Sequence, residues 1–352
     1  MAIIIAIVSL LVLVALHELG HFLVAKKFGV KVEEFGIGIP PRIVAKKFGE
    51  TVYSLNILPI GAFVKIYGED KKIKDERSFS EKTIFQRALI LLGGVVAFWV
   101  VAFILLTMIM GLGFPVVISD DVPSPNARVV ILGVEDNLPA AEAGMMPGDI
   151  LIKLSSNVGE VVIERVSDVR SFLSDNRGNE IIALVERGNS NEELVIISHE
   201  DDGIMGVFLE RTEIRKYPWH EAPFRGALMT GTITANVVYS LGSSAKRAIF
   251  RQPLPPGVQV AGPVGIVRDF FAGAIERGFV DYLQVMVMIS ISLAIFNLIP
   301  IPALDGGRLM FLAIEKIKGS PINQKLEQNL VMVSFIMLIG LFFLVTFYDI
   351  WG

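Results

Sequence analysis

The chain has no cysteine among its 352 residues, which excludes disulfides, thiolate zinc sites, iron–sulfur clusters and cysteine nucleophiles. Charged residues are also scarce, at 19%, where a soluble globular domain averages about 25%. Basic residues are not in excess, because 32 Lys and Arg face 36 Asp and Glu, so the chain lacks the positive field that attracts nucleic acid. Only four histidines are present, and the position of each therefore carries information.

Long apolar runs take the place of the missing charge, since 53% of the residues are hydrophobic. A helix needs about 20 apolar residues to cross the hydrocarbon core of a bilayer. Three runs approach or exceed that length, Ala2–Ala25, Ala88–Met110 and Leu330–Tyr348. A fourth, Tyr282–Ile299, meets Pro300 at its end, which predicts a helix that breaks at membrane depth. We therefore expect a polytopic α-helical membrane protein with about four transmembrane helices.

The loops differ in charge, and this difference predicts their side of the membrane. From Lys26 to Arg87 there are 13 Lys and Arg against 8 Asp and Glu, whereas from Phe114 to Glu221 there are 9 against 20. By the positive-inside rule the first loop lies in the cytoplasm and the long acidic segment lies outside. The stretch after Pro300 then returns to the cytoplasmic side.

The acidic segment reads as a small β-rich domain with a short helix at Val166–Ser174. Its β-prone runs are Arg128–Val134, Ile181–Val185 and Leu194–Ser198. The stretch Ala140–Leu151 resembles the core of a PDZ domain, a fold that binds extended peptides by adding a strand to a sheet edge. A rigid spacer of the same fold is the alternative. After it, Ala222–Phe250 has helical periodicity, which fits either a membrane-surface helix or a plain connector.

A metal-binding motif lies inside the first apolar run, where His17-Glu18-Leu19-Gly20-His21 matches H-E-x-x-H. Residues four apart share one face of a helix, so His17 and His21 can reach one ion. Two imidazoles and a carboxylate suit zinc and leave a fourth position for water, whose proton Glu18 can take. A polar patch that joins helices is the alternative. Because ionisable groups within a membrane helix are costly and usually mark function, we favour a zinc-dependent hydrolase.

A third protein ligand is needed, and the candidates are His199, His220 and the carboxylates. Both histidines lie on the predicted outer side without a partner at metal-ligand spacing, so we interpret them as surface residues. Asp305, on the cytoplasmic side like H-E-x-x-H, is the better candidate because the adjacent Gly306 allows close backbone approach. The residues alone leave a second interpretation equally open, in which Asp305 is the N-cap of a helix that begins at Gly306.

The two motifs together resemble the site-2 protease family of intramembrane zinc metalloproteases, in its bacterial PDZ-containing, sigma-E-regulator branch. The second motif is N-x-x-P-x-P-x-L-D-G, here Asn297 to Gly306. The resemblance implies that His17, His21 and Asp305 bind Zn²⁺ and that Glu18 is the catalytic base. It also implies that Asn297 contacts the substrate backbone or stabilises the oxyanion.

The resemblance further implies a multi-pass protein of the bacterial inner (plasma) membrane that cleaves single-span membrane proteins, such as anti-sigma factors or signal-peptide remnants, by regulated intramembrane proteolysis. Peptide termini would bind the PDZ-like domain, outside, with the active site near the cytoplasm. We expect four regions. Residues 1–113 hold two spans and a hairpin loop, 114–213 the inserted PDZ-like domain, 214–281 a connector, and 282–352 the last two spans.

Two segments refine this expectation. Thr51–Tyr67 alternates and resembles the membrane-associated β-hairpin of the family, which we expect to clamp an extended substrate beside the zinc; a soluble cytoplasmic hairpin is the alternative. Residues 93–98 depart from the family pattern A-G-P-x-x-N, with Phe98 in place of the asparagine. For the whole chain, a non-catalytic zinc-containing scaffold that binds peptides is the competing function, although only three protein ligands can be named where structural zinc usually has four.

Overall fold

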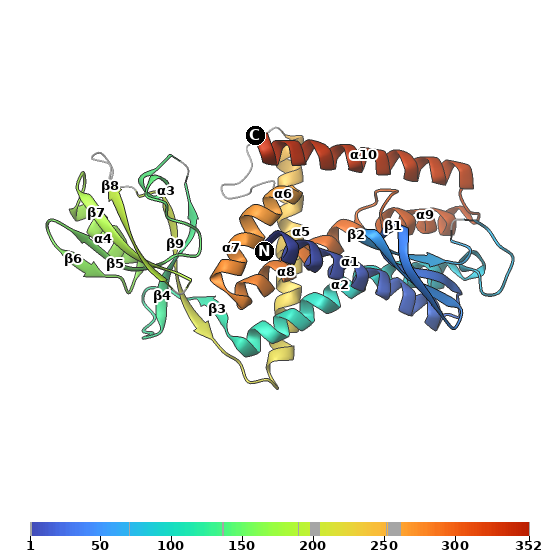
Figure 1. The fold of residues 1–352 in the computed structure, drawn as a ribbon, viewed down its shortest axis with the longest axis horizontal. Coiled ribbons are helices and arrows are strands. Elements are labelled where there is room, and N and C mark those ends of the chain that lie inside the picture. Colours follow the sequence, from blue (N-terminus) through green and yellow to red (C-terminus); the bar gives the residue numbers. More distant parts are fainter. Residues whose placement is uncertain are drawn as a thin grey trace. The chain divides into compact units, whose positions relative to one another are not determined.

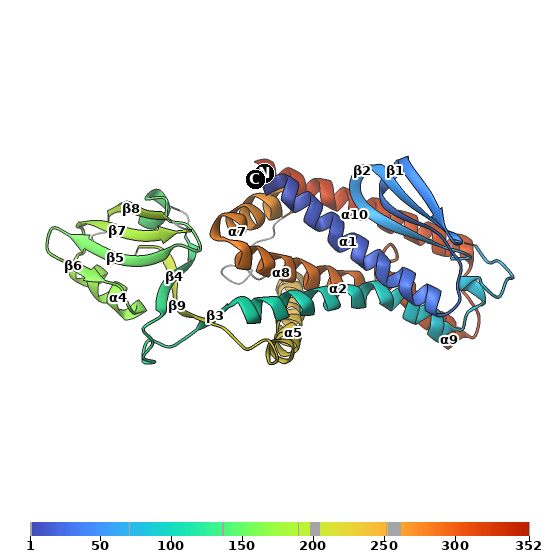
Figure 2. The same ribbon diagram turned by 60° about the horizontal axis from the view of Figure 1, so that its bottom comes forward.

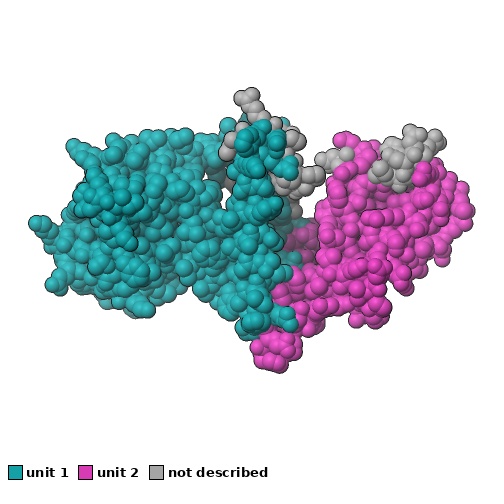
Figure 3. Space-filling model, turned by 180° about the vertical axis from the view of Figure 1, so that it is seen from behind, with its two compact units in different colours: residues 1–107, 223–273, 282–352 teal, residues 108–222, 274–281 magenta. Residues whose placement is uncertain are grey.

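The computed structural model describes residues 2–69, 71–135, 137–188, 190–197, 205–250, 252 and 262–351. These residues form two compact units, which Figure 3 colours separately. Unit 1 contains residues 1–107, 223–273 and 282–352. Unit 2 contains residues 108–222 and 274–281.

Four helices are long and apolar enough to cross a membrane (Figure 1). They are α1 (Ala2–Lys27), α2 (Ile84–Leu112), α8 (Phe279–Leu298) and α10 (Gln324–Trp351). The prediction of about four spans is confirmed. Helices α1, α2 and α10 extend beyond the predicted apolar runs, because flanking polar residues continue a helix without adding to its hydrophobicity. Helix α8 begins three residues before its run and ends one residue before the end of that run. The chain is thus a polytopic membrane protein with additional β-sheets.

Helices α1, α2 and α8 pack together in unit 1 through a shared core. Two glycines set the closest approach of α1 and α2, because a side chain at Gly93 would meet the backbone of Gly20, with its Cβ 2.7 Å from the Gly20 carbonyl oxygen. This contact turns the His17 and His21 face of α1 towards α2. Buried members of the core include Leu13 of α1, Phe98 of α2 and Ala294 of α8.

The predicted break after the third span is confirmed. Helix α8 ends at Leu298 and α9 (Asp305–Lys318) begins after six intervening residues, because Pro300 and Pro302 cannot continue a helix. Gly306 and Gly307 pack directly on the backbone of the connecting segment, where any Cβ would overlap carbonyl groups of residues 298 to 301. This close turn fixes where the first residue of α9 points.

A bent β-hairpin, β1 (Val32–Phe48) and β2 (Thr51–Ile66), lies beside α1 in both ribbon views (Figures 1 and 2). The hairpin predicted around Thr51–Tyr67 is therefore present. Its register gives residues 34–37 two sets of partners, residues 52–55 on one side and residues 62–65 on the other. Residues 62–65 consequently form one outer row of the hairpin.

Unit 2 is built on a seven-stranded sheet of order β3-β9-β4-β5-β7-β8, with β6 paired to β5. Its core contains inward-facing residues of these strands together with Ala140 of α3 and Val169 of α4. The β-rich interpretation is confirmed, including the helix predicted at Val166–Ser174; Ser198 and His199 lie outside the described residues. The elements are β3 (Phe114–Val117), β4 (Ala127–Val134), α3 (Pro139–Glu142), β5 (Ile150–Ser156), β6 (Glu160–Val162), α4 (Val166–Asp175), β7 (Glu180–Arg187), β8 (Ser190–Ile197) and β9 (Val207–Arg215).

The remaining elements connect these parts. The helix predicted at Ala222–Phe250 is α5 (Ala222–Ile249). It is long and amphipathic, and its helical periodicity is visible in the sequence. Short helical segments lead into α8, and a single 3-10 turn precedes α2. These are α6 (Pro263–Gly265), η2 (Ile266–Phe271), α7 (Ala272–Arg277) and η1 (Phe79–Glu81).

Candidate metal centre

Helix α1 presents two buried imidazoles one turn apart. His17 and His21 are 7% and 6% exposed, and their Nε2 atoms lie 3.2 Å from each other. Neutral imidazoles can meet in this way when both nitrogens direct lone pairs towards a shared point. A helix places residues i and i+4 on one face, so the spacing of the motif produces this convergence locally.

Asp305, the first residue of α9, completes the cluster from 284 positions further along the chain. Its Oδ2 atom lies 3.3 Å from Nε2 of His17 and 3.4 Å from Nε2 of His21. The N-cap of α9 is Leu304, and its side chain makes no capping bond. Of the two interpretations that the sequence left open, the structure thus shows the carboxylate facing the histidines, without the predicted capping role.

These three side chains fit a zinc ion in both chemistry and spacing. Among the described residues, they form the only group of three or more His, Asp or Glu side chains whose potential ligand atoms all lie within 4.8 Å of one another. Ligands about 2.0–2.2 Å from a tetrahedral zinc ion are separated from each other by about 3.3–3.5 Å, close to the edges of this triangle. The Oδ2 atom of Asp305 is buried and has no hydrogen-bond partner among the described residues, as expected of a ligand atom reserved for a cation. Three protein ligands leave one tetrahedral position free, which is the pattern of catalytic zinc.

The surroundings of the histidines orient them differently. Nδ1 of His21 lies 2.8 Å from the carbonyl oxygen of Ile90, so it carries the proton and Nε2 keeps its lone pair for the cluster. Nδ1 of His17 is buried without a hydrogen-bond partner among the described residues. Instead, the ring of Phe98 stacks on His17, with centroids 4.7 Å apart and planes inclined by 20°.

Gly94 of α2 faces the cluster directly, because a Cβ at this position would overlap both imidazoles. In the sequence, residues 93–98 stand out only as a departure from a family pattern, which does not predict this contact. The signal available was the pair of adjacent glycines in an apolar helix, where glycine usually has a packing reason.

Glu18 lies half-buried on α1 beside the cluster. Its carboxylate interacts electrostatically with the backbone of Val64 in β2 and with His17, His21 and Asp305. Asn297 is also half-buried, and its Nδ2 donates to the carbonyl oxygen of Leu293 at 2.9 Å. His220 is exposed in unit 2, and its nearest recorded partner is Glu221 at 3.8 Å.

Comparison with known proteins agrees with this geometry. Residues 5–341 match the model of peptidase family M50. The Clostridium perfringens (strain 13 / Type A) protein named "Putative zinc metalloprotease CPE1693" is 33% identical over 353 residues, which cover 99% of this chain and 98% of the relative. The Bacillus subtilis (strain 168) protein named "Regulator of sigma-W protease RasP" is 28% identical over 423 residues, covering 96% and 95%. The "Zinc metalloprotease RasP" of Bacillus licheniformis is 27% identical and covers 96% of both chains.

The family match spans nearly the whole chain and includes the segments that carry His17, His21 and Asp305. A relative above 30% identity aligns from end to end. The resemblance to site-2 proteases is therefore confirmed. The chain belongs to peptidase family M50, the site-2 protease family, and is a bacterial membrane zinc metalloprotease.

Proposed function

We propose that this protein hydrolyses peptide bonds in or near the transmembrane segments of single-span membrane proteins, as in regulated intramembrane proteolysis. The observation that carries the proposal is the convergence of His17, His21 and Asp305 within 3.2–3.4 Å of one another, on helices of a four-span protein. His17, His21 and Asp305 would hold the zinc ion. When bound, zinc supplies a Lewis acid that polarises the scissile carbonyl and makes water more acidic.

Glu18 is the proposed general base. It neighbours the metal ligands in sequence, and its carboxylate interacts with the backbone of Val64 in β2. Glu18 would take a proton from the attacking water and pass it to the leaving amine. Asn297 would hold the oxyanion, because an amide has two N–H donors and only one is used by Leu293.

The substrate strand is proposed to bind beside β2. Residues 62–65 pair with residues 34–37 on one side, and no strand within the described residues pairs with their other side. Glu18 contacts this row at Val64. A substrate helix that unwinds in the membrane exposes backbone groups at a cost of several kcal/mol each, and pairing with a sheet edge satisfies them.

The division into residues 1–113, 114–213, 214–281 and 282–352 is part of this proposal. Residues 114–213 would be a PDZ-like domain outside the cell membrane that binds peptide termini, which its sheet and helix α4 support. The basic first loop would face the cytoplasm, with the metal centre near that side of the inner membrane. The name of the Bacillus subtilis relative, a regulator of sigma-W, supports an anti-sigma factor as the substrate class.

The test compares membrane-protein fragments released in cells that carry wild-type protein, Glu18→Gln or Glu81→Gln. Glu81 is exposed on the loop before α2 and provides a matched loss of one carboxylate. We expect Glu18→Gln to retain zinc in the purified protein and to release no fragments that begin or end within a transmembrane segment. Equal fragment sets from wild type and Glu18→Gln would refute the proposed role.

A further inference from the structure

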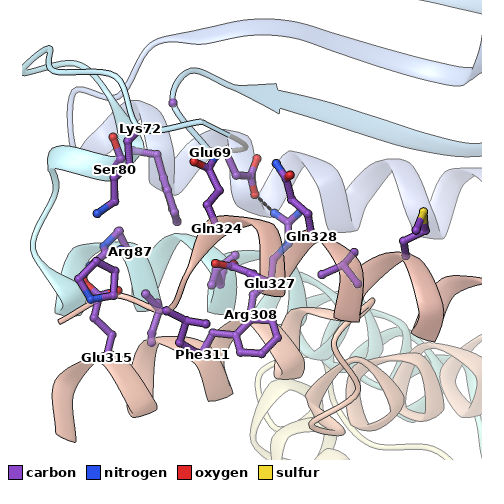
Figure 4. Close-up of a pocket in the computed structure, with 18 of the residues that line it drawn as sticks. Glu69, Lys72, Ser80, Arg87, Arg308, Phe311, Glu315, Gln324, Glu327 and Gln328 are labelled. Atoms are coloured by element: carbon purple, nitrogen blue, oxygen red, sulfur yellow. Dashed lines mark hydrogen bonds and ion pairs between the residues drawn. The ribbon is translucent and has the colours of Figure 1, made fainter. Parts of the chain in front are cut away.

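A cavity of about 330 Å³ lies in unit 1 at the beginning of α10 (Figure 4). Five parts of unit 1 line it: residues 68, 69, 72, 79 and 80 before α2, the start of α2, helix α9, residues 321–322 between α9 and α10, and residues 324–335 of α10. None of the metal ligands lines it. The cavity is therefore a second site, separate from the metal centre.

The charged side chains of the cavity are only partly paired with one another. Arg87 forms an ion pair with Glu315 at 2.6 Å, and Arg308 forms one with Glu69. Figure 4 draws the second pair as a dashed line. Six charged groups line the site in all, Lys72, Arg87, Arg308, Glu69, Glu315 and Glu327.

One positive and one negative group remain after these pairs are formed. Lys72 has no ion-pair partner within the described part of the chain, and Glu327 has none there either, although it feels the charges of Arg308, Glu315 and Arg87. In addition, the Nε atom of Arg87 is buried without a hydrogen-bond partner among described residues. A buried N–H that lacks an acceptor is costly, which favours a ligand that brings one.

The other wall of the cavity is apolar. Leu91 of α2 and Phe311 of α9 face Val331, Met332 and Phe335 of α10. Helix α10 has no buried residue, so its apolar side chains contact lipid in a membrane. Arg87 is the fourth residue of one span and Glu327 the fourth of another, so the polar end of the cavity coincides with the ends of two spans. The cavity is thus polar at the ends of the spans and apolar along them, as a site at the bilayer interface would be.

We propose that this cavity binds the headgroup of a membrane phospholipid that carries a primary amine, of the phosphatidylethanolamine type. The phosphodiester, with one negative charge, would accept from Arg87 Nε–H and pair with Lys72. The ammonium, with one positive charge, would donate to Glu327. The acyl chains would lie along Val331, Met332 and Phe335. A zwitterion matches the charges that remain, whereas an anionic headgroup leaves Glu327 unpaired and a choline headgroup offers it no N–H donor.

Such a lipid would join α10 to α9, the helix that begins with the metal ligand Asp305. The proposal does not depend on the peptidase mechanism, because none of its residues belongs to the metal centre. A failure to bind lipid would therefore leave the assignment of the metal centre unchanged. A failure of the proposed peptidase function would likewise leave the lipid proposal unchanged.

The experiment measures lipid binding to the purified, delipidated full-length protein by native mass spectrometry. Phosphatidylethanolamine, phosphatidylglycerol and phosphatidylcholine of identical acyl chains are added separately, and water-soluble glycerophosphoethanolamine is the competitor. Lys72→Gln and Glu327→Gln are compared with Lys74→Gln and Glu76→Gln, which remove the same charges from loop residues that do not line the cavity.

We expect one phosphatidylethanolamine to bind at least tenfold more tightly than either other lipid. Lys72→Gln should weaken all binding about tenfold, one hydrogen-bonded charge being worth about 1.5 kcal/mol, and Glu327→Gln should remove only the preference for ethanolamine. Equal binding of the three lipids, or insensitivity to both cavity variants, would overturn the proposal. Full displacement by equimolar glycerophosphoethanolamine would overturn the assignment to a membrane lipid.

Discussion

The ring of Phe98 stacks on the imidazole of His17, with centroids 4.7 Å apart and planes inclined by 20°. Metal-bound histidines usually donate their second N–H to a carbonyl or carboxylate, as His21 does to Ile90. His17 has no such acceptor among the described residues. Its orientation is instead set by packing, and Phe98 is itself held because its carbonyl oxygen accepts a hydrogen bond from Ser290 Oγ at 2.8 Å.

Phe98→Leu should therefore weaken zinc binding. Loss of the stacking surface frees the His17 ring to rotate, and changes around metal ligands typically reduce affinity about 10- to 100-fold. Zinc affinity is measured by competition with a chelator, and the visible spectrum of the cobalt-substituted protein reports the ligand geometry. Phe271→Leu is the matched control, since Phe271 is fully buried in the same core cluster. Equal losses in the two variants would show that Phe98 contributes only to packing.

Gly94→Ala should expel or displace the metal. A methyl group there would overlap the imidazoles of His17 and His21, so the rings would have to leave the positions in which their Nε2 atoms converge. We expect zinc affinity to fall more than about tenfold. Gly340→Ala makes the same change in α10, where the space around the glycine is open. Metal analysis of both purified proteins decides the matter, and full zinc occupancy in Gly94→Ala would contradict the prediction.

Ala62→Pro and Phe63→Pro should each abolish substrate cleavage and leave zinc binding intact. These residues lie in the outer row of the hairpin that we propose as the substrate edge, and proline removes an N–H and disturbs strand pairing. Lys46→Pro is the control, because residues 42–48 form the row at the opposite side of the same hairpin. A cleavage assay on a single-span substrate is combined with metal analysis. Unchanged cleavage in both outer-row variants would exclude the edge as the substrate site.

Asp120 gives unit 2 a dependence on pH. Burial raises the pKa of this carboxyl, but the N–H groups of Ser167 and Val166 at the start of α4 outweigh it, so the pKa lies below its usual value. Asp120 therefore stabilises the folded state above the unfolded pKa of about 3.9, and this stabilisation is lost as pH falls through the lower folded-state pKa.

Asp120→Asn should speed hydrogen exchange of the α4 amides at about pH 7, by an amount that corresponds to about 1 kcal/mol, because the amide keeps one acceptor oxygen where the carboxylate accepts two N–H bonds. The difference from wild type should shrink as pH falls through the folded-state pKa. Exchange is measured on the full-length protein, with Asp121→Asn as the neighbouring control, since Asp121 is exposed. If the difference in exchange rate between Asp120→Asn and wild type did not change with pH, the effect would come from altered packing and not from the charge of Asp120.

The spans and the soluble unit were predictable because their signals are local. The apolar runs predicted all four helices that could cross a membrane, and turn residues and β-prone runs predicted the sheet around Val129 and Ile181. The helix ends were less accurate, since Lys27 or Gln324 can continue a helix without contributing to its hydrophobicity. The two-sided pairing of residues 34–37 left no signal, because period-two alternation does not tell which segments become neighbours.

By itself the sequence determined the membrane class and the pairing of His17 with His21, because helical geometry places residues four apart on one face. It could not decide whether Asp305 caps a helix or faces the histidines, because a carboxylate that follows Pro300 and Pro302 fits both roles. The tertiary structure decided this by folding the segment after α8 back towards α1. It also decided that Phe98 and Gly94 surround the metal ligands. Such contacts depend on how two helices cross, and no spacing within one segment encodes that crossing.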